Sequence, residues 1–182
     1  YDENFDWIVG DHYSLGQEWE MQMKVISEKI FVIDDLVERK HECNLLLNHT
    51  NLPGIKKKYM NLTPNSTRLL LGPRYLLLDP KYLKRRKRIT NVNGVIKRIF
   101  IYYGSIDPSN ETEKALSALI ELNRKDIIID VVIGRNNPNL EKIENLVLKI
   151  ENANLYVQLP DLSEIMSKAD LALSVGGYTL WE

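Results

Sequence analysis

The sequence predicts an α/β protein built on parallel β-sheets, and two observations carry this prediction. Short apolar runs alternate with polar or amphipathic connections along most of the 182 residues, which is the pattern of strands joined by helices and loops. From residue 95 onward the alternation becomes regular and reads as β-α-β-α-β-α-β. This order is typical of a parallel sheet with helices on both faces.

The composition favours an ordinary soluble protein. Hydrophobic residues make up 44% of the chain, charged residues 27%, and the net charge is -1, so nothing attracts nucleic acid or anionic lipid in general. No apolar run approaches the roughly 20 residues that span a bilayer, and the start has no signal-peptide pattern. The single cysteine, Cys43, excludes an internal disulfide and is expected to be a small buried hydrophobe. We therefore expect a cytoplasmic protein without a membrane or nucleic-acid partner.

In the first half, an apolar run at residues 5–10 starts almost directly at the first residue, as a strand from the middle of a sheet would. Ser14 can cap a helix that extends to about residue 27 and packs one apolar face in the core. Further strands are expected at 29–33, 44–47 and 69–71, whereas the stretch before the last of these, which contains Pro53 and Gly54, reads as irregular.

Five consecutive cations at residues 84–88, followed by asparagines and a glycine, predict an exposed connector. We place the domain boundary near residue 92, which gives domains at 1–91 and 92–182. Nucleic-acid binding is the alternative for the cationic run, but one short patch without interleaved aromatic residues favours a solvated helix end and linker.

The second half contains the regular pattern. Strands are expected at residues 96–103, 127–133, 155–157 and 171–175, and helices at 109–123, 138–150 and 162–167. In an open parallel sheet, ligands bind outside the carboxyl ends of the strands, so the loops after the strands are the places where a site is expected.

Two of these loops can hold a nucleotide. The loop after residue 103 contains Gly104, which lets the backbone approach a ligand, and Asp107 or Ser109 can cap the next helix. The second loop has a pair of glycines, Gly176 and Gly177, and is expected to open a helix whose amide groups suit a diphosphate. Either loop could equally be a plain turn. Thr179 offers a hydroxyl donor, and the Glu182 carboxylate can accept hydrogen bonds from the two hydroxyls of a ribose.

Titratable residues follow two strands of the first half. Asp11, His12 and Tyr13 end the first strand, and Asp34 and Asp35 end the next, where such side chains can face a cleft or simply terminate a strand. The other histidines lack the spacing of a metal site, so no metal is expected.

Five segments carry a resemblance that covers nearly the whole chain. They are IVGDHYSL, VIDDLVERKHECNLLLN, LLLGPRYLLLDPKY, RIFIYYGSIDPSN and ADLALSVGGYTLWE, in this order. With these segments the chain resembles the family of UDP-sugar hydrolases of pseudaminic acid biosynthesis, which includes spore coat polysaccharide and flagellin modification proteins.

The resemblance implies an architecture of glycosyltransferase-B type, with two Rossmann-like domains that are both incomplete here. Domain 1–91 would bind the sugar and carry catalysis, and domain 92–182 would bind UDP, with no cofactor. The implied reaction is hydrolysis of UDP-2,4-diacetamido-2,4,6-trideoxy-β-L-altropyranose, in which water attacks the anomeric carbon with inversion and releases UDP.

The same resemblance implies roles for individual residues. Tyr13 matches the tyrosine beside the catalytic centre, and Asp11 and His12 would support it. Ser105 stands where the family usually has a glycine. The residues on the nucleotide side would be Gly104, Ser105, Asp107, Gly176, Gly177, Thr179 and Glu182.

The family's base is a histidine in a glycine-rich loop after its first strand, and this chain has no counterpart of that loop. The helices expected after Glu182 are also absent. We therefore expect this chain to be inactive by itself, although its parent would be an enzyme, and exposed apolar surface can lead it to self-associate. A glycosyltransferase of the same fold and a non-catalytic nucleotide-sugar-binding module are the alternatives.

Overall fold

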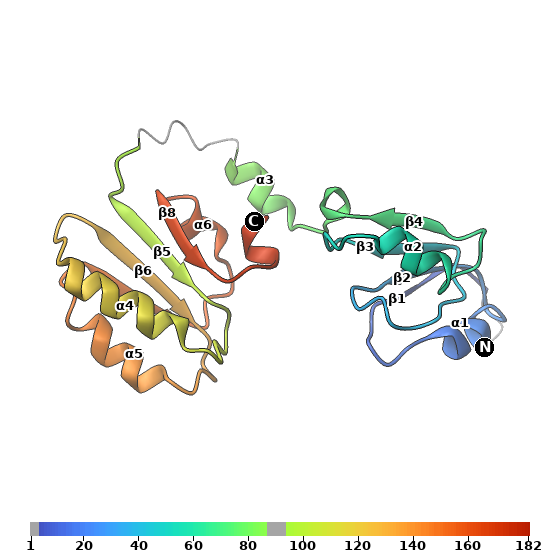
Figure 1. The fold of residues 1–182 in the computed structure, drawn as a ribbon, viewed down its shortest axis with the longest axis horizontal. Helices are drawn as coiled ribbons and strands as arrows, with labels where there is room; N and C mark the ends of the chain where they lie inside the picture. The colour runs from blue at the N-terminus through green and yellow to red at the C-terminus, as the bar shows by residue number, and fades with distance from the viewer. Residues whose placement is uncertain (1–3, 87–93) are drawn as a thin grey trace. The chain divides into compact units, whose positions relative to one another are not determined.

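The structure, a computed structural model, describes residues 4–86 and 94–182 (Figure 1). The chain divides into unit 1, Tyr1–Leu77, and unit 2, Leu78–Glu182. The boundary predicted near residue 92 lies outside the described residues. The observed division falls earlier, so helix α3 (Pro80–Arg86) belongs to unit 2, where Arg85 Nε donates a hydrogen bond of 2.9 Å to Ser163 Oγ.

Unit 1 is a four-stranded parallel sheet in the order β1-β2-β3-β4. The expected strands of the first half are confirmed, with small shifts at their ends. The elements are β1 (Phe5–Gly10), α1 (Gln17–Met23), β2 (Ser27–Ile33), β3 (Leu45–Asn48), α2 (Ile55–Met60), β4 (Arg68–Leu71) and the 3-10 helix η1 (Pro73–Tyr75).

Two expectations for unit 1 were wrong. The helix expected from Ser14 to residue 27 is only α1, because Gly16 is still extended (φ -144°, ψ -162°) and Ser27 already begins β2. The stretch expected to be irregular contains α2. Gly54, with φ 71°, turns the chain just before this helix, which places Tyr59 in the core.

The core of unit 1 lies on one face of its sheet, where alternate residues of β2 and β3 meet α2. Cys43 is 3% exposed, which confirms that it is a buried hydrophobe. The buried members are Ile30, Val32, Val37, Cys43, Leu46 and Tyr59. Edge strand β1 exposes Phe5, Trp7 and Val9, and self-association through such a surface stays a prediction.

Unit 2 is a parallel sheet in the order β7-β6-β5-β8. The strands and helices expected within residues 96–175 are all present. Besides α3, the elements are β5 (Arg98–Tyr102), α4 (Glu111–Leu122), β6 (Ile128–Ile133), α5 (Leu140–Val147), β7 (Ala153–Val157), α6 (Ser163–Met166), β8 (Leu171–Ser174) and the 3-10 helix η2 (Tyr178–Leu180).

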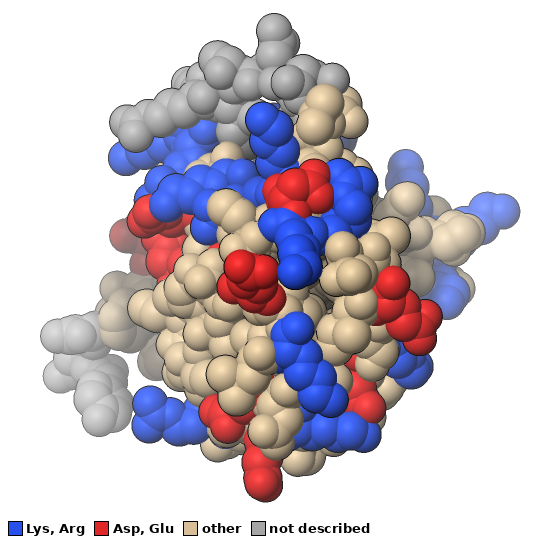
Figure 2. Space-filling view, turned by 90° about the vertical axis from the view of Figure 1, so that its left-hand side faces the viewer, with Lys and Arg blue, Asp and Glu red and all other residues tan. Residues whose placement is uncertain are grey.

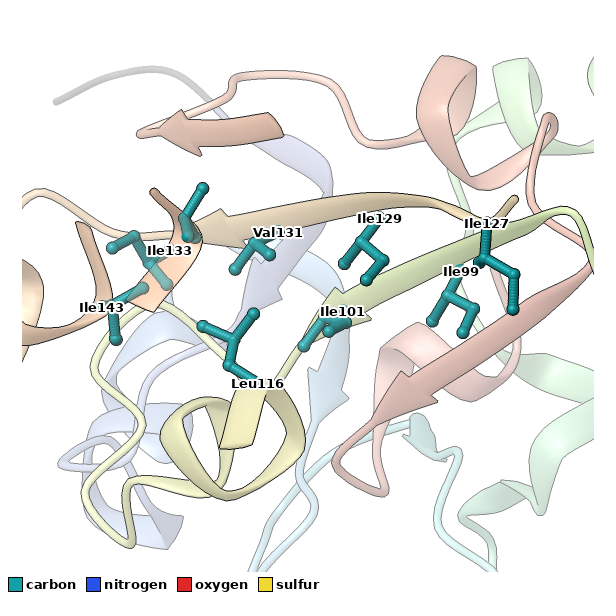
Figure 3. Packing of buried hydrophobic residues seen from close by; sticks show 9 residues of the cluster. Ile99, Ile101, Leu116, Ile127, Ile129, Val131, Ile133 and Ile143 are labelled. Carbon is teal, nitrogen blue, oxygen red and sulfur yellow. The ribbon is translucent and has the colours of Figure 1, made fainter. Parts of the chain in front are cut away.

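Helices cover both faces of this sheet, which explains why its strands read as nearly continuous apolar runs. On one face, Leu116 of α4 and Ile143 of α5 pack against alternate residues of β5 and β6, such as Ile101 and Val131 (Figure 3). On the other face, Ile165 of α6 packs near Phe100 and Val132. Unit 2 is therefore a Rossmann-like layer arrangement, with α4 and α5 on one side and α6 on the other (Figure 1).

Charged side chains of both signs are interspersed on the face that Figure 2 presents. Of the cationic run, residues 87 and 88 lie outside the described residues, and Arg85 is engaged with Ser163 and, at 3.9 Å, with the Glu164 carboxylate. None of the helices in residues 4–86 and 94–182 combines the length and apolarity needed to cross a membrane.

Candidate functional site

The strand order of unit 2 brings the two glycine loops to one place. The chain runs outward from β5 through β6 to β7 and then crosses back to β8, on the opposite side of β5. Tyr102, at the end of β5, pairs with Ser174, at the end of β8. The loops after these two strands therefore flank the point where strand order reverses, which is where open α/β sheets form their ligand crevice.

The loop after β5 is held by a contact that the sequence did not reveal. Gly104 has φ 88°, and the following Ser105 accepts a hydrogen bond of 3.0 Å at its carbonyl from the Gly134 amide, after β6. A Cβ on Gly134 would lie 2.6 Å from the Ser105 carbonyl oxygen, so only glycine allows this approach. The one signal in the sequence is a glycine directly after an apolar strand.

Asp107 is committed to the start of α4. Its side chain is buried, and its two oxygens accept hydrogen bonds from the amides of Glu111 (3.0 Å) and Thr112 (2.8 Å). Of the two roles expected for Asp107, the structure thus shows helix capping. Its role on the nucleotide side stays a prediction, since each carboxylate oxygen can accept a further hydrogen bond.

The loop after β8 is open on the side of its first glycine. A Cβ on Gly176 would meet only Leu180 Cδ1, at 4.0 Å, and Gly177 has φ 132°. After this loop the described residues form the 3-10 turn η2, which contains a half-buried Thr179, and the Glu182 amide donates a bond of 3.2 Å to the Tyr178 carbonyl, so a longer helix stays a prediction. Three residues are too few for a helix dipole, so any anion here would rely on the loop amides themselves.

Glu182 lies in a pocket of about 330 Å³ within unit 2. Burial, the negative charge of Glu182 and a hydrogen bond to its carboxylate together raise the pKa of the Tyr82 phenol. The lining residues include Tyr82, Arg85, Arg86, Leu180, Trp181 and Glu182. The pocket lining thus combines a carboxylate, two guanidinium groups and two aromatic side chains.

In unit 1, Asp11, His12 and Tyr13 follow β1 on an exposed turn. The Tyr13 hydroxyl lies 3.4 Å from Asp35 Oδ2, and the charge of Asp35 raises the pKa of this phenol. His12 Nδ1 accepts a hydrogen bond of 3.0 Å from the Ser14 amide. Because β1 and β2 are parallel neighbours, their carboxyl ends bring Tyr13 and Asp35 together.

A buried polar cluster lies beneath this turn. The sequence singled out Asp34 at the end of a strand and considered His41 only as a metal ligand, so it did not indicate the cluster. Tyr59 donates a hydrogen bond of 2.6 Å to Asp34 Oδ2 and accepts one of 2.9 Å from Asn48 Nδ2. His41 Nδ1 lies 2.7 Å from Glu20 Oε1, and its Nε2 lies 3.8 Å from Asp34 Oδ2. All five side chains are nearly inaccessible.

The charges of this cluster fix its protonation. Burial alone would lower the pKa of His41, but the carboxylates of Asp34 and Glu20 outweigh it and raise the pKa to about 9. Burial likewise opposes ionisation of Asp34, but His41, Tyr59 and Arg39 hold the pKa of this carboxyl well below its usual range. Asp34 is therefore ionised and His41 protonated at neutral pH. Within residues 4–86 and 94–182, no three His, Cys, Asp or Glu side chains are placed to bind a metal ion together.

No family model matches this chain. It is similar to an uncharacterised protein, MJ1062, of Methanocaldococcus jannaschii, with 25% identity over 183 residues that cover 97% of this chain and 38% of that protein. It is also similar to UDP-2,4-diacetamido-2,4,6-trideoxy-beta-L-altropyranose hydrolase of Campylobacter jejuni, with 26% identity over 171 residues, 93% of this chain and 59% of the hydrolase.

A third similar protein is the spore coat polysaccharide biosynthesis protein SpsG of Bacillus subtilis, with 29% identity over 118 residues, 64% of this chain and 34% of SpsG. The chain thus spans between about a third and three fifths of these relatives' lengths. Its distant relatives with named functions are a nucleotide-sugar hydrolase and a polysaccharide biosynthesis protein.

Proposed function

We propose that this chain is part of a nucleotide-sugar hydrolase, in which unit 2 binds UDP and unit 1 carries residues that face the sugar. The observation that carries the proposal is the position of the Gly104 and Gly176 loops at the ends of neighbouring strands, where strand order reverses. The name of the Campylobacter jejuni relative supports UDP-2,4-diacetamido-2,4,6-trideoxy-β-L-altropyranose as the substrate.

In this proposal the diphosphate lies over the loop after β8, where the amides near Gly176 and Gly177 donate hydrogen bonds and a Cβ at Gly176 would meet only Leu180 Cδ1, at 4.0 Å. The hydroxyl of Thr179 adds a donor, and the carboxylate of Glu182 binds the ribose hydroxyls. Gly104 and Ser105 form the facing wall, in a position fixed by Gly134.

The proposed reaction is hydrolysis at the anomeric carbon. Water forms a bond to that carbon, the bond from carbon to the UDP oxygen breaks, and UDP leaves with the bonding electrons while a proton from the water passes to a base. On the sugar side, Tyr13 is protonated at neutral pH, as phenols with a pKa of about 10 are, and Asp35 raises its pKa further. It can therefore donate a hydrogen bond to the sugar or to the leaving group, with Asp11 and His12 beside it.

Calorimetric titration of the chain with UDP tests the nucleotide site. Gly176→Asp and Gly176→Asn are a matched pair of variants, because both side chains fit the open space at Gly176 and have nearly the same size, but only aspartate repels a phosphate. We expect Gly176→Asp to weaken UDP binding at least about tenfold more than Gly176→Asn, which corresponds to about 1.4 kcal/mol. Equal affinities for UDP, or no binding by the unchanged chain, would refute the site.

The reaction is tested with UDP-sugar in 18O-labelled water, using both this chain and the longer gene product. Hydrolysis incorporates 18O from water into the free sugar. A glycosyltransferase instead transfers the sugar to the hydroxyl of an acceptor, so its product contains no 18O from water. UDP binding without any release of UDP from the sugar substrate would favour a non-catalytic binding module.

A further inference from the structure

Arg39 connects the buried cluster of unit 1 to the exposed turn that holds Tyr13. Its Nη2 donates a hydrogen bond of 2.7 Å to Asp34 Oδ1. Its Nη1 donates to the carbonyls of His12 at 3.1 Å and Leu15 at 2.7 Å, and also to the carbonyl of Tyr13. One guanidinium thus binds three backbone carbonyls of a single turn, and the His12 carbonyl also accepts a hydrogen bond of 3.3 Å from the Leu15 amide.

The anchor for Arg39 is rigid. The Asp34 side chain is 0% exposed, and its second oxygen accepts hydrogen bonds from the Tyr59 hydroxyl (2.6 Å) and the Val37 amide (3.1 Å). With the protonated His41 also close by, the carboxylate has little freedom to rotate. The guanidinium that pairs with it is therefore fixed in the plane that reaches the turn.

The backbone between Asp34 and Arg39 is held in an unfavourable conformation. Val37 is a buried β-branched residue with φ 60°, a left-handed conformation that such residues rarely adopt. Backbone strain of this kind persists only where surrounding contacts outweigh it, and it concentrates at functional sites. Here the bond from its amide to Asp34 closes the bend after β2, and Arg39 follows two residues later.

We infer that Arg39 is a positioning residue for the Asp11-His12-Tyr13 turn, and that the charged cluster of Glu20, His41 and Asp34 exists to hold it. Through the backbone of the turn, Arg39 keeps the Tyr13 phenol beside Asp35. Its effect on catalysis rests on the proposed function, whereas its effect on the turn does not.

The first test uses Arg39→Lys, which retains a positive charge for Asp34 but cannot form a fork to several carbonyls. Hydrogen exchange and NMR are measured on the full chain. In Arg39→Lys the turn loses hydrogen bonds from a charged donor, which are among the stronger ones. We therefore expect the turn to open more often, and the amides of Ser14 and Leu15 to exchange at least about tenfold faster. The pKa of the Tyr13 phenol should fall toward its ordinary value, while the amides of β2 and β3 keep their protection. The matched control is Arg68→Lys, at the exposed amino end of β4.

The second test is kinetic and separates positioning from general destabilisation. With the longer gene product and UDP-sugar, Arg39→Lys should lower kcat at least about tenfold while KM and the affinity for UDP stay within about twofold. Free guanidinium at low millimolar concentration should restore part of the activity of Arg39→Ala, since it can occupy the vacated site. A merely structural defect would not respond to guanidinium.

The outcomes separate the two proposals. A turn that loosens in Arg39→Lys while the unchanged protein shows no turnover supports this inference and refutes the proposed hydrolysis. Unchanged exchange at Ser14 and Leu15 overturns the inference, whatever the turnover. Normal kcat in a variant whose turn has loosened overturns the catalytic role of the turn.

Discussion

The stability of unit 1 should fall as the pH rises from 6.5 to 9, and His41 should be the cause. The carboxylates of Asp34 and Glu20 outweigh burial and raise the pKa of this histidine from its ordinary value of 6.5 to about 9. A raised pKa in the folded state stabilises the protein below the unfolded-state pKa, and that contribution is lost as the pH rises through the folded-state pKa. At about 1.4 kcal/mol per pKa unit, the protonated histidine contributes about 3 kcal/mol at pH 6 and very little above pH 10.

The measurement is urea unfolding at a series of pH values, followed by tryptophan fluorescence in a Trp181→Phe background. Of the three tryptophans only Trp7 and Trp19 then remain, and both belong to unit 1. The free energy of unfolding should decrease by up to about 1.4 kcal/mol per pH unit between pH 6.5 and 9. His41→Gln should be less stable than the unchanged chain at pH 6, and this difference should shrink toward pH 9 and beyond.

His12→Gln, at the exposed histidine of the same unit, is the matched control and should keep the slope of the unchanged chain. If His41→Gln does not fold, an NMR titration of the unchanged chain gives the answer, because the His41 ring should remain protonated at pH 8. A stability difference that is independent of pH, or a ring that loses its proton near pH 6.5, would contradict the assignment of charge in the cluster.

Two further predictions concern unit 2. Gly134→Ala should lower its unfolding free energy by about 1–3 kcal/mol, because the new Cβ would lie 2.6 Å from the Ser105 carbonyl oxygen. Gly176→Ala is the control and should be nearly neutral, since its Cβ would have only one contact, at 4.0 Å. Equal effects of the two variants in thermal unfolding would refute the close contact at Gly134. Arg98→Met should cost about 3 kcal/mol or more by leaving the buried Asp130 carboxylate without the guanidinium 2.6 Å away. Adding Asp130→Leu should recover most of that loss in urea unfolding, and a double variant no more stable than Arg98→Met would contradict it.

Much of unit 2 can be read from the sequence, because its strands and helices follow hydrophobic periodicity closely. The position of the glycine loops at the carboxyl ends of strands also follows from general rules, but the return of β8 beside β5 is known only from the structure. The contact between Gly134 and Ser105 could not be predicted, because it depends on an approach within a few ångströms between residues 29 positions apart. Asp107 was ambiguous for a different reason, since capping a helix and binding a ligand call for the same carboxylate.

Unit 1 was harder to predict, and its site depends on features that local preferences oppose. Val37 is a β-branched residue in a left-handed conformation, and Glu20 is a charged residue on the buried face of a helix. Glu20 is stabilised by a tertiary contact with His41, and Val37 by burial in the core and by the bond from its amide to Asp34. Hydrophobic periodicity and intrinsic propensity indicate neither residue's environment. His41 was considered only for its spacing to other metal-ligating residues, and its partner Glu20 lies 21 residues away, so their buried pair was not anticipated.

The two units position their loops by opposite physical means, and this decides which mutations can reveal each site. In unit 2, the loop geometry comes from missing side chains: Gly134 permits a close approach, and Gly176 leaves room for a ligand. Truncating Asp107 in the first of these loops would remove the cap of α4, so added atoms or charges at the glycines are the more direct tests of the proposed site. In unit 1, the turn is held by buried charge, and removing Arg39 or Asp34 leaves its partner in a medium where an unpaired charge is costly. Truncating either side chain can unfold unit 1 as well as displace the turn, and the two effects cannot then be told apart. Substitutions that keep the charge and change only the hydrogen-bond geometry, such as Arg39→Lys, are therefore the informative ones.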